Sequence, residues 1–347
     1  MSIIILNYNG SGVVENCLES VLATNYPNFE VIMVDNASVD GSYQAVLKRF
    51  SKYKRLIIVR SEVNLGFAGG NNLGLKYAAG SYVSLLNNDT TVDKDWLIEA
   101  VKIAESDNKI GEVQSKLFFW YNPEVLESAG AFIDKAGYGF ERGFVRGKDH
   151  FLTSEEIFYA NGAAVTIKRA AIEQIQSNNM FELFDGDYFF AYEDVDISWK
   201  IRLVGLKAVV APLSVVYHRR STSTSRRREL LTFHHCKNRI LTLVKNYSLS
   251  NLFRYLPVLI VLESIRAVSS LAGGNKSAAK AIIRAYLWNL INFKHSWTKR
   301  LAVQRFVRRM PDEYITMIMK NVNPTSLIYN QRLYKKFSEA TGVNINR

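Results

Sequence analysis

The stretch Ser2-Ile-Ile-Ile-Leu-Asn-Tyr-Asn-Gly10 decides the fold of this 347-residue chain. Its apolar run predicts a buried strand over 2–6, and the polar residues after it predict a turn. Residues 11–23 then place apolar side chains at helical spacing, which predicts a helix. A strand, a turn and a helix in this order open a βαβ unit.

The same alternation continues along the chain. Short apolar runs predict further strands over 31–34, 56–59, 82–86 and 207–211, and helices are expected up to about residue 51 and over 193–204. Strands that alternate with helices predict an α/β fold with a largely parallel sheet and helices on both faces. Residues 110–160 are aromatic and irregular, so strands and a mobile loop over the site are expected there.

Composition favours one large domain followed by a basic tail. Residues 1–217 hold 20 Lys and Arg against 27 Asp and Glu, a net charge of −7, whereas residues 218–347 hold 24 against 5, a net charge of +19. We therefore predict a core domain over 1–220 and a basic helical region over 221–347. Cys17 and Cys236 suit neither a disulfide framework nor a zinc site, so inert packing in a reducing cytosol is expected.

The basic tail indicates an anionic partner, either a membrane surface or nucleic acid. Its apolar run over 255–262 is interrupted by Glu263 and is too short for a spanning helix, which needs about 20 residues. Residues 281–293 combine apolar and basic side chains, which is typical of a helix lying on anionic lipid. The alternative is a helical subdomain that packs on itself or on another subunit. The first residues lack a charged leader, so no signal peptide is expected.

Polar residues follow several of the predicted strands. Asp35, Asp89 and His218 each come after an apolar run, and the pair Glu193–Asp194 opens a predicted helix. Because open α/β sheets bind ligands outside the carboxyl ends of their strands, a nucleotide and its metal are expected at that rim.

A glycine-rich loop, Asn64-Leu-Gly-Phe-Ala-Gly-Gly-Asn-Asn-Leu-Gly74, lies between the third and fourth strands. It matches neither the G-x-G-x-x-G nor the G-x-x-x-x-G-K-[ST] pattern, which disfavours a Rossmann dinucleotide site and a P-loop. Ligand contact and tight helix packing are equally good explanations of its glycines.

Five segments in order resemble the family 2 glycosyltransferases over about residues 1–220. They are Ile3-Ile-Ile-Leu-Asn-Tyr-Asn9, Val34-Asp-Asn-Ala-Ser-Val-Asp-Gly41, residues 64–72, Leu86-Asn-Asn-Asp-Thr90 and Tyr192-Glu-Asp-Val-Asp196. The resemblance implies an inverting enzyme with the GT-A fold and its Rossmann-like sheet. The glycine-rich third segment looks like that of the rhamnosyltransferase and galactofuranosyltransferase branch.

The resemblance also implies roles for single residues. Asp35 would bind the nucleobase beside the turn Asn7, Tyr8 and Asn9, and Asp89 would bind a divalent cation, Mn²⁺ or Mg²⁺, with His218 as a further ligand. The first position of the D-x-D-like motif is Asn87, so the metal would rest on Asp89 alone among these three residues. The remaining residues expected to bind the nucleotide sugar are Asn36, Asn64, Gly66, Gly70, Asn71, Asn88 and Arg202.

Glycosyl transfer needs a base for the acceptor hydroxyl and stabilisation of the departing diphosphate. Asp194 is expected to be the base and Glu193 to orient the acceptor, while Arg202 or the pair Arg219–Arg220 adds positive charge. Simpler explanations remain open, because Asp35 and Asp89 are also favoured turn residues and acidic residues favour the first turn of a helix.

The sequence thus predicts a metal-dependent glycosyltransferase that uses a UDP- or dTDP-sugar, such as dTDP-rhamnose. Its acceptor would be a glycan or a lipid-linked saccharide, and it would be peripheral on the cytoplasmic face of a membrane. A sugar nucleotidyltransferase and a non-catalytic nucleic-acid-binding protein are the alternatives, although no motif for reading nucleic acid is present. An oligomer is possible.

Overall fold

The computed structural model describes residues 1–176, 182–220, 228–323 and 336–339. Its centre is a ten-stranded sheet, and a separate two-stranded sheet pairs β8 with β9. The strands are β1 (Ser2–Asn7), β2 (Glu30–Asn36), β3 (Leu56–Ser61), β4 (Tyr82–Asn87), β5 (Thr90–Val92), β6 (Ile110–Phe119), β7 (Asn122–Ser128), β8 (Ala131–Ile133), β9 (Gly139–Glu141), β10 (Glu156–Ile157), β11 (Ala164–Lys168) and β12 (Lys207–His218).

The sheet is parallel where the sequence alternates strands with helices. Its order is β10-β12-β6-β11-β4-β1-β2-β3, and β1, β2, β3 and β4 run parallel to one another. β11 is antiparallel to both of its neighbours, β4 and β6. The apolar residues of β1 and β2 are buried because these strands are covered on both faces.

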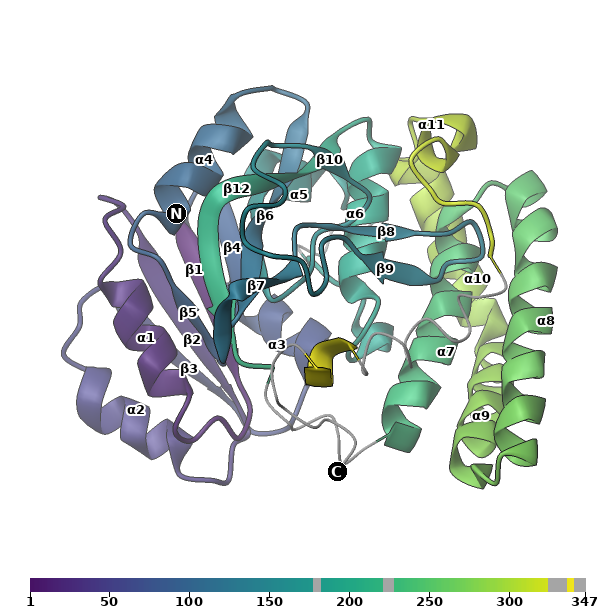
Figure 1. The fold of residues 1–347 in the computed structure, drawn as a ribbon, viewed down its shortest axis with the longest axis horizontal. Helices are drawn as coiled ribbons and strands as arrows, with labels where there is room; N and C mark the ends of the chain where they lie inside the picture. Colours follow the sequence, from purple (N-terminus) through teal and green to yellow (C-terminus); the bar gives the residue numbers. More distant parts are fainter. Residues whose placement is uncertain (177–181, 221–227, 324–335, 340–347) are drawn as a thin grey trace.

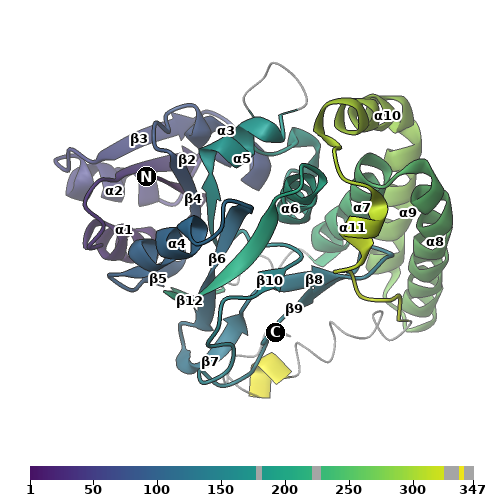
Figure 2. The same ribbon diagram turned by 90° about the horizontal axis from the view of Figure 1, so that it is seen from above.

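Helices cover the two faces of the sheet (Figure 2). One face packs against α1 (Val14–Leu22), α2 (Ser42–Phe50) and α4 (Trp96–Glu105). The other packs against α3 (Gly66–Leu75), α5 (Arg169–Gln174) and α6 (Glu193–Leu203). The predicted α/β fold with helices on both faces is therefore confirmed.

The C-terminal helices stand beside α6, at the right of Figure 1. They are α7 (Arg228–Asn246), α8 (Leu249–Ala272), α9 (Lys276–Ile291) and α10 (Phe293–Ala302), followed by a π-helical turn (Val303–Val307) and α11 (Asp312–Thr316). Apolar residues of α7, α8 and α9 belong to the same buried cluster as those of α3 and α6. The C-terminal region thus shares its hydrophobic core with the sheet domain.

Two elements are longer than the sequence predicts. The last strand does not end at Ala211 but continues through Pro212 to His218, with an irregular register between Ala211 and Val215. The apolar run around Pro257 belongs to the 24-residue α8, which in the described part of the chain is the one helix with the length and composition to cross a membrane. The prediction that this segment is too short was therefore wrong.

Candidate active site

The strand register brings the predicted motifs to one rim of the sheet. Asn7 at the end of β1 pairs with Asp35 of β2, and Leu6 pairs with Asn87 of β4. At the other side of the rim, the end of β12 pairs His218 with Thr90. The ends of β1, β2, β4 and β12 therefore lie close together at this rim.

Asn7 links three of these segments through its side-chain amide. The amide nitrogen donates to Asp35 Oδ1 at 3.1 Å and to Ser42 Oγ at 3.0 Å. The amide oxygen accepts a hydrogen bond from Asn88 Nδ2 at 2.8 Å. Asn7 and Asp35 are fully buried, so Asn7 orders the rim and orients the Asp35 carboxylate.

Asp35 and the glycine-rich loop form the second part of the site. Asp35 Oδ2 accepts a hydrogen bond from the Ser38 amide and lies 3.6 Å from Arg60 Nε. Next to it, Asn36 Nδ2 donates to Asn64 Oδ1 at 3.0 Å and to the Gly66 carbonyl at 3.1 Å. The second and third motifs are therefore joined directly.

The structure gives the glycines of that loop a packing role. Gly66 has a φ of +71°, and a Cβ atom there would lie 2.4 Å from the Phe189 carbonyl oxygen. A Cβ atom at Gly70 would lie 2.3 Å from Leu6 Cδ1, so α3 can approach β1 only with glycine at this position. The predicted donor-binding residue Asn71 is buried and donates to the Phe67 carbonyl in its own helix.

Asp89 and His218 lie side by side, with Asp89 Oδ1 3.2 Å from His218 Nε2. The other ring nitrogen, Nδ1, is 2.8 Å from Glu127 Oε2, and Glu127 also pairs with Arg220 at 2.8 Å. Burial alone would lower the pKa of His218, but the carboxylates of Glu127 and Asp89 raise it to about 10. A carboxylate that fixes the far nitrogen of a histidine is the usual support of a metal ligand.

Asp89 and His218 could supply some of the ligands of a divalent cation. Asp89 offers an oxygen and His218 a nitrogen, a donor set that Mn²⁺ accepts, and binding would displace the imidazolium proton. No group of three or more His, Cys, Asp or Glu side chains forms a metal cluster within the described residues. Substrate phosphates and water would therefore complete the coordination. Glu127 was not predicted, because its contact with His218 depends on strand pairing rather than on spacing.

The acidic pair, Glu193 and Asp194, lies in the first turn of α6. Asp194 accepts hydrogen bonds from the amides of Val195 at 2.8 Å and Gly162 at 3.4 Å. Burial raises the pKa of Asp194 to about 6. Burial and the Asp194 charge together raise the pKa of Glu193 well above its ordinary value. With a pKa of about 6, Asp194 is ionised at neutral pH, the state that a general base requires.

Glu141 of β9 is a second residue that the sequence did not reveal. Its Oε1 accepts from Asn161 Nδ2 at 3.1 Å, and its Oε2 is buried without a hydrogen-bond partner among the described residues. Burial raises the pKa of Glu141 to about 7, opposed by the Ser128 hydroxyl and Arg220, while Glu127 and Asp194 add to the rise. Glu141 is therefore within electrostatic reach of both Asp194 and Glu127, the partner of His218.

The arginines correct one prediction. Arg202 is 1% exposed, and its guanidinium binds Glu156 and the carbonyls of Phe158 and Ile157. It anchors β10 to α6, so the structure shows its guanidinium bound to protein groups in place of the predicted donor contact. Arg219 and Arg220 stand at the rim, because the Arg219 amide donates to the Asp89 carbonyl. Tyr8 is 39% exposed, and Asn9 accepts from the Val39 amide.

Comparison with known proteins identifies the family of the sheet domain. The family model "Glycosyl transferase family 2" matches residues 2–174. The protein y4gI of Sinorhizobium fredii is 30% identical over 237 residues, which are 64% of this chain and 25% of that protein. The poly-beta-1,6-N-acetyl-D-glucosamine synthase of Staphylococcus epidermidis is 25% identical over 219 residues, 62% of this chain and 49% of that protein. The chain thus spans a quarter to about half of these relatives.

Solved structures show the same fold. Residues 1–349 of TarS from S. aureus in complex with UDP match with a TM-score of 0.54 and 16% identity, over 98% of this chain and 90% of that one. The mannosyltransferase PcManGT of Pyrobaculum calidifontis, in complex with GDP-Man and Mn²⁺, matches with a TM-score of 0.52 and 18% identity, over 87% and 84%. The chain therefore carries a glycosyl transferase family 2 domain, built on the α/β fold of GT-A glycosyltransferases.

Proposed function

We propose that this chain is an inverting, metal-dependent glycosyltransferase that moves a sugar from a nucleoside diphosphate to a hydroxyl group. The observation that carries the proposal is the proximity of the Asp89–His218 pair to the Glu193–Asp194 pair. Residues 162–163 join them, because the Gly162 amide donates to Asp194 at 3.4 Å and the Ala163 carbonyl accepts from the Asn87 amide at 3.0 Å. One pair offers ligands for a cation beside a diphosphate, and the other offers a base beside an acceptor. Both are needed for a single displacement at a sugar carbon.

The chain's own residues account for the steps. Asp194, ionised at neutral pH, accepts the proton of the acceptor hydroxyl as that oxygen attacks the anomeric carbon. Attack from the side opposite the diphosphate inverts this carbon. Glu193 holds the acceptor by a hydrogen bond, and Arg219 and Arg220 add positive charge at the rim. A divalent cation bound by Asp89 and His218 would stabilise the negative charge of the departing diphosphate.

The donor is proposed to be a UDP- or dTDP-sugar. Asp35 is buried beside Arg60 at the end of β2, where it can accept hydrogen bonds from a pyrimidine base. The TarS complex contains UDP, which favours the same nucleotide here. A rhamnosyl or galactofuranosyl donor, including dTDP-rhamnose, and a glycan or lipid-linked acceptor complete the proposal. The family match favours this function over nucleotidyl transfer and over nucleic-acid binding.

Calorimetric titration with UDP, dTDP and GDP, each with and without Mn²⁺, tests the proposal. We expect one nucleotide to bind in a Mn²⁺-dependent way and Asp89→Ala to lose at least tenfold in that affinity, because Asp89 supplies the carboxylate ligand. Asp93→Ala, in the exposed turn after β5, is the matched control and should bind as the native chain does. Absence of binding by the native chain to all three nucleotides would contradict the proposal.

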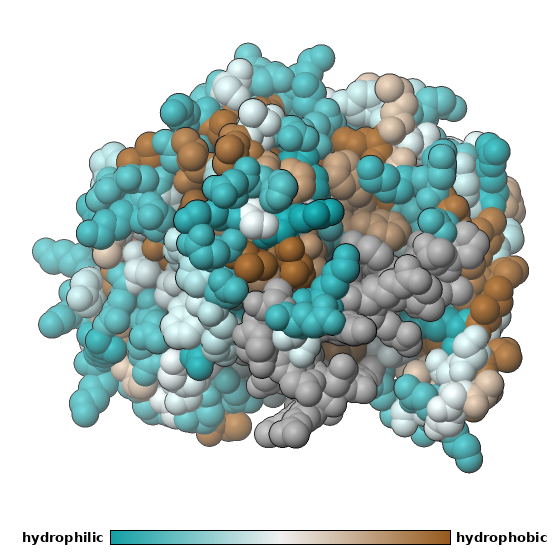
Figure 3. Space-filling model, in the orientation of Figure 1, coloured by the Kyte–Doolittle hydropathy of each residue, from teal (hydrophilic) through white to brown (hydrophobic). Residues whose placement is uncertain are grey.

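We further propose that the outer faces of α8 and α9 dock on an anionic membrane surface. Apolar side chains are exposed there, and Figure 3 shows hydrophobic residues gathered along the edge formed by these helices. They include Phe253, Val261, Val268, Ile283, Leu287, Leu290 and Ile291. Exposed basic residues flank them at Lys276, Lys280, Arg284 and Lys294. Apolar residues beside cations complement anionic lipid better than they complement nucleic acid.

Cosedimentation with vesicles tests this surface. The native chain should sediment with phosphatidylserine-containing vesicles at low salt and less with neutral ones, because Lys and Arg contribute about 1 kcal/mol each near an anionic surface. The double variant Leu290→Asp/Ile291→Asp should reduce the bound fraction several-fold, since both side chains are more than 70% exposed. Val39→Asp, 89% exposed on the sheet domain, is the control. Equal sedimentation of all three proteins would reject the proposed surface.

A further inference from the structure

The backbone that leads into the acidic pair has an unusual conformation. Phe189, Ala191 and Tyr192 have φ angles of 60°, 67° and 70°, although none of them is glycine. Side chains disfavour this region, so such residues persist only where their surroundings hold them. Glu193 follows directly. The position of the acidic pair therefore depends on the contacts that hold the segment before it, residues 183–192.

The α7 residue Asn238 binds the backbone of the segment through three side-chain hydrogen bonds. Its side-chain amide nitrogen donates to the carbonyl oxygens of Tyr188 at 3.0 Å, Phe190 at 2.9 Å and Ala191 at 2.6 Å. Asn238 is fully buried. Three carbonyl oxygens that converge on one buried amide fix the path of the backbone through the positive-φ residues.

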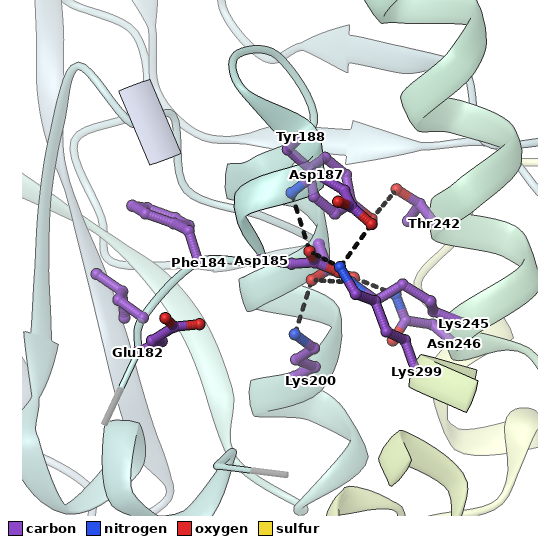
Figure 4. Close-up of polar contacts among 12 residues, drawn as sticks. Glu182, Phe184, Asp185, Asp187, Tyr188, Lys200, Thr242, Lys245, Asn246 and Lys299 are labelled. Atoms are coloured by element: carbon purple, nitrogen blue, oxygen red, sulfur yellow. Dashed lines mark hydrogen bonds and ion pairs between the residues drawn. The ribbon is translucent and has the colours of Figure 1, made fainter. Parts of the chain in front are cut away.

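Other groups of α7 surround this contact. Thr242 Oγ1 lies 2.8 Å from the Tyr188 hydroxyl, and the His234 ring lies 4.5 Å from the Phe190 ring. Lys245 Nζ is 2.7 Å from Asp185 Oδ2, at the start of the segment. Figure 4 shows Thr242 and Lys245 of α7 directed toward residues 185–188.

The opposite side of the segment contacts the glycine-rich motif. The Phe189 carbonyl accepts a hydrogen bond from the Ala68 amide at 3.1 Å and lies where a side chain at Gly66 would be. Asn72 binds the backbone of Leu183 and Phe184. The segment is therefore held between the predicted donor-binding motif and the C-terminal helix α7.

We propose that Asn238 is a positioning residue of the catalytic centre, whose amide holds residues 188–192 so that Glu193 and Asp194 face the reacting groups. This inference rests on the proposed glycosyl transfer and extends the catalytic centre into the C-terminal region. Asn238 itself touches no substrate. It acts through the backbone that begins α6.

The test compares Asn238→Asp and Asn238→Ala with a matched control, Asn289→Ala. The aspartate variant keeps the size of the side chain but replaces its donors with an acceptor that repels the three carbonyls. Asn289 on α9 also donates to two backbone carbonyls, those of Lys237 and Ala285, but does not contact the segment. Turnover is measured as nucleotide release from UDP-glucose, UDP-N-acetylglucosamine and dTDP-rhamnose, and binding as calorimetric affinity for UDP with Mn²⁺.

Both Asn238 variants should lower kcat at least tenfold while UDP affinity stays within twofold, and hydrogen exchange of the amides in 183–196 should become faster. The control should change none of these. Adding Ala191→Gly to Asn238→Ala should restore kcat several-fold, because glycine adopts positive φ without strain. This rescue separates positioning from a general loss of folding.

Two results would overturn the proposal. One is that both Asn238 variants keep the native kcat and the native, slow exchange of the amides in 183–196. The other is that exchange of these amides becomes faster while kcat stays unchanged. A native chain that neither binds UDP nor releases nucleotide from any of the three donors would instead refute the proposed function. In that outcome the exchange data would still report whether Asn238 holds the segment, so the two failures are distinguishable.

Discussion

Asp194→Asn should lower kcat by about 10²- to 10⁴-fold, the usual contribution of a general base, while nucleotide binding is retained. Asparagine keeps the shape of the carboxylate, and its one side-chain oxygen can still accept from the Val195 amide, whereas the weaker 3.4 Å hydrogen bond from the Gly162 amide to Oδ2 is lost. It cannot accept the acceptor proton. Steady-state kinetics and calorimetry on the same preparation measure the two effects separately.

The pH dependence sharpens this prediction. Since burial raises the pKa of Asp194 to about 6, kcat of the native chain should be level above pH 7 and fall about tenfold per unit below pH 6, as the base becomes protonated. Glu193→Gln is the matched control, because glutamine keeps the size of Glu193 and its ability to hydrogen-bond the acceptor, while Asp194 stays available as the base. This variant should retain far more activity than Asp194→Asn. Equal loss in both variants would contradict the assignment of the base.

The sheet and most of its rim could be predicted from the sequence. Apolar runs of strand length end at Asp35, Asn87 and His218, and parallel pairing brings the ends of such strands together. The runs carry this information locally, so a single sequence suffices. Glu127 and Glu141 could not be predicted, because the strands that carry them pair across irregular turns with no periodic signal.

Two further differences from the predictions have the same physical origin. Arg202 was predicted to bind the donor, but in the structure its guanidinium pairs with Glu156 of β10, a two-residue strand that gives no sequence signal. Glu263 appeared to interrupt an apolar run, yet it is fully buried and pairs with Arg239 of α7 and Arg266. Both charged side chains pair with residues far away in the sequence, and no local sequence pattern reveals such partners.

A buried ion network joins α6 to the C-terminal helices, and its centre is Lys245. This ammonium is 1% exposed and lies 2.7 Å from Asp185 Oδ2 and 2.9 Å from Asp196 Oδ2 (Figure 4). Asp196 also pairs with Lys200 at 2.8 Å and accepts from Asn246 Nδ2 at 2.8 Å. Every member therefore has a partner of opposite charge or a hydrogen bond. Removing the shared cation leaves two buried carboxylates with reduced compensation.

Lys245→Met should consequently lower the free energy of unfolding, but by less than the about 3–5 kcal/mol that an unpaired buried charge costs, because Asp196 keeps Lys200 and Asp185 keeps Lys299. Chemical denaturation measures it, and Lys102→Met, which removes an exposed lysine paired with Glu99, should leave the midpoint unchanged. A second readout is the response to acid. Burial alone would raise the pKa of Asp196, but Lys200 and Lys245 outweigh it and lower the pKa to about 2.

Because the folded pKa of Asp196 is depressed, its stabilising contribution is complete above the ordinary value of 3.8 and is lost as the pH falls toward about 2. The native chain should therefore lose stability steeply across that window, and Lys245→Met should lose less, since part of the contribution is already gone. If Lys245→Met unfolds at the same denaturant concentration as the native chain, with the same acid response, the network does not hold the C-terminal helices to α6.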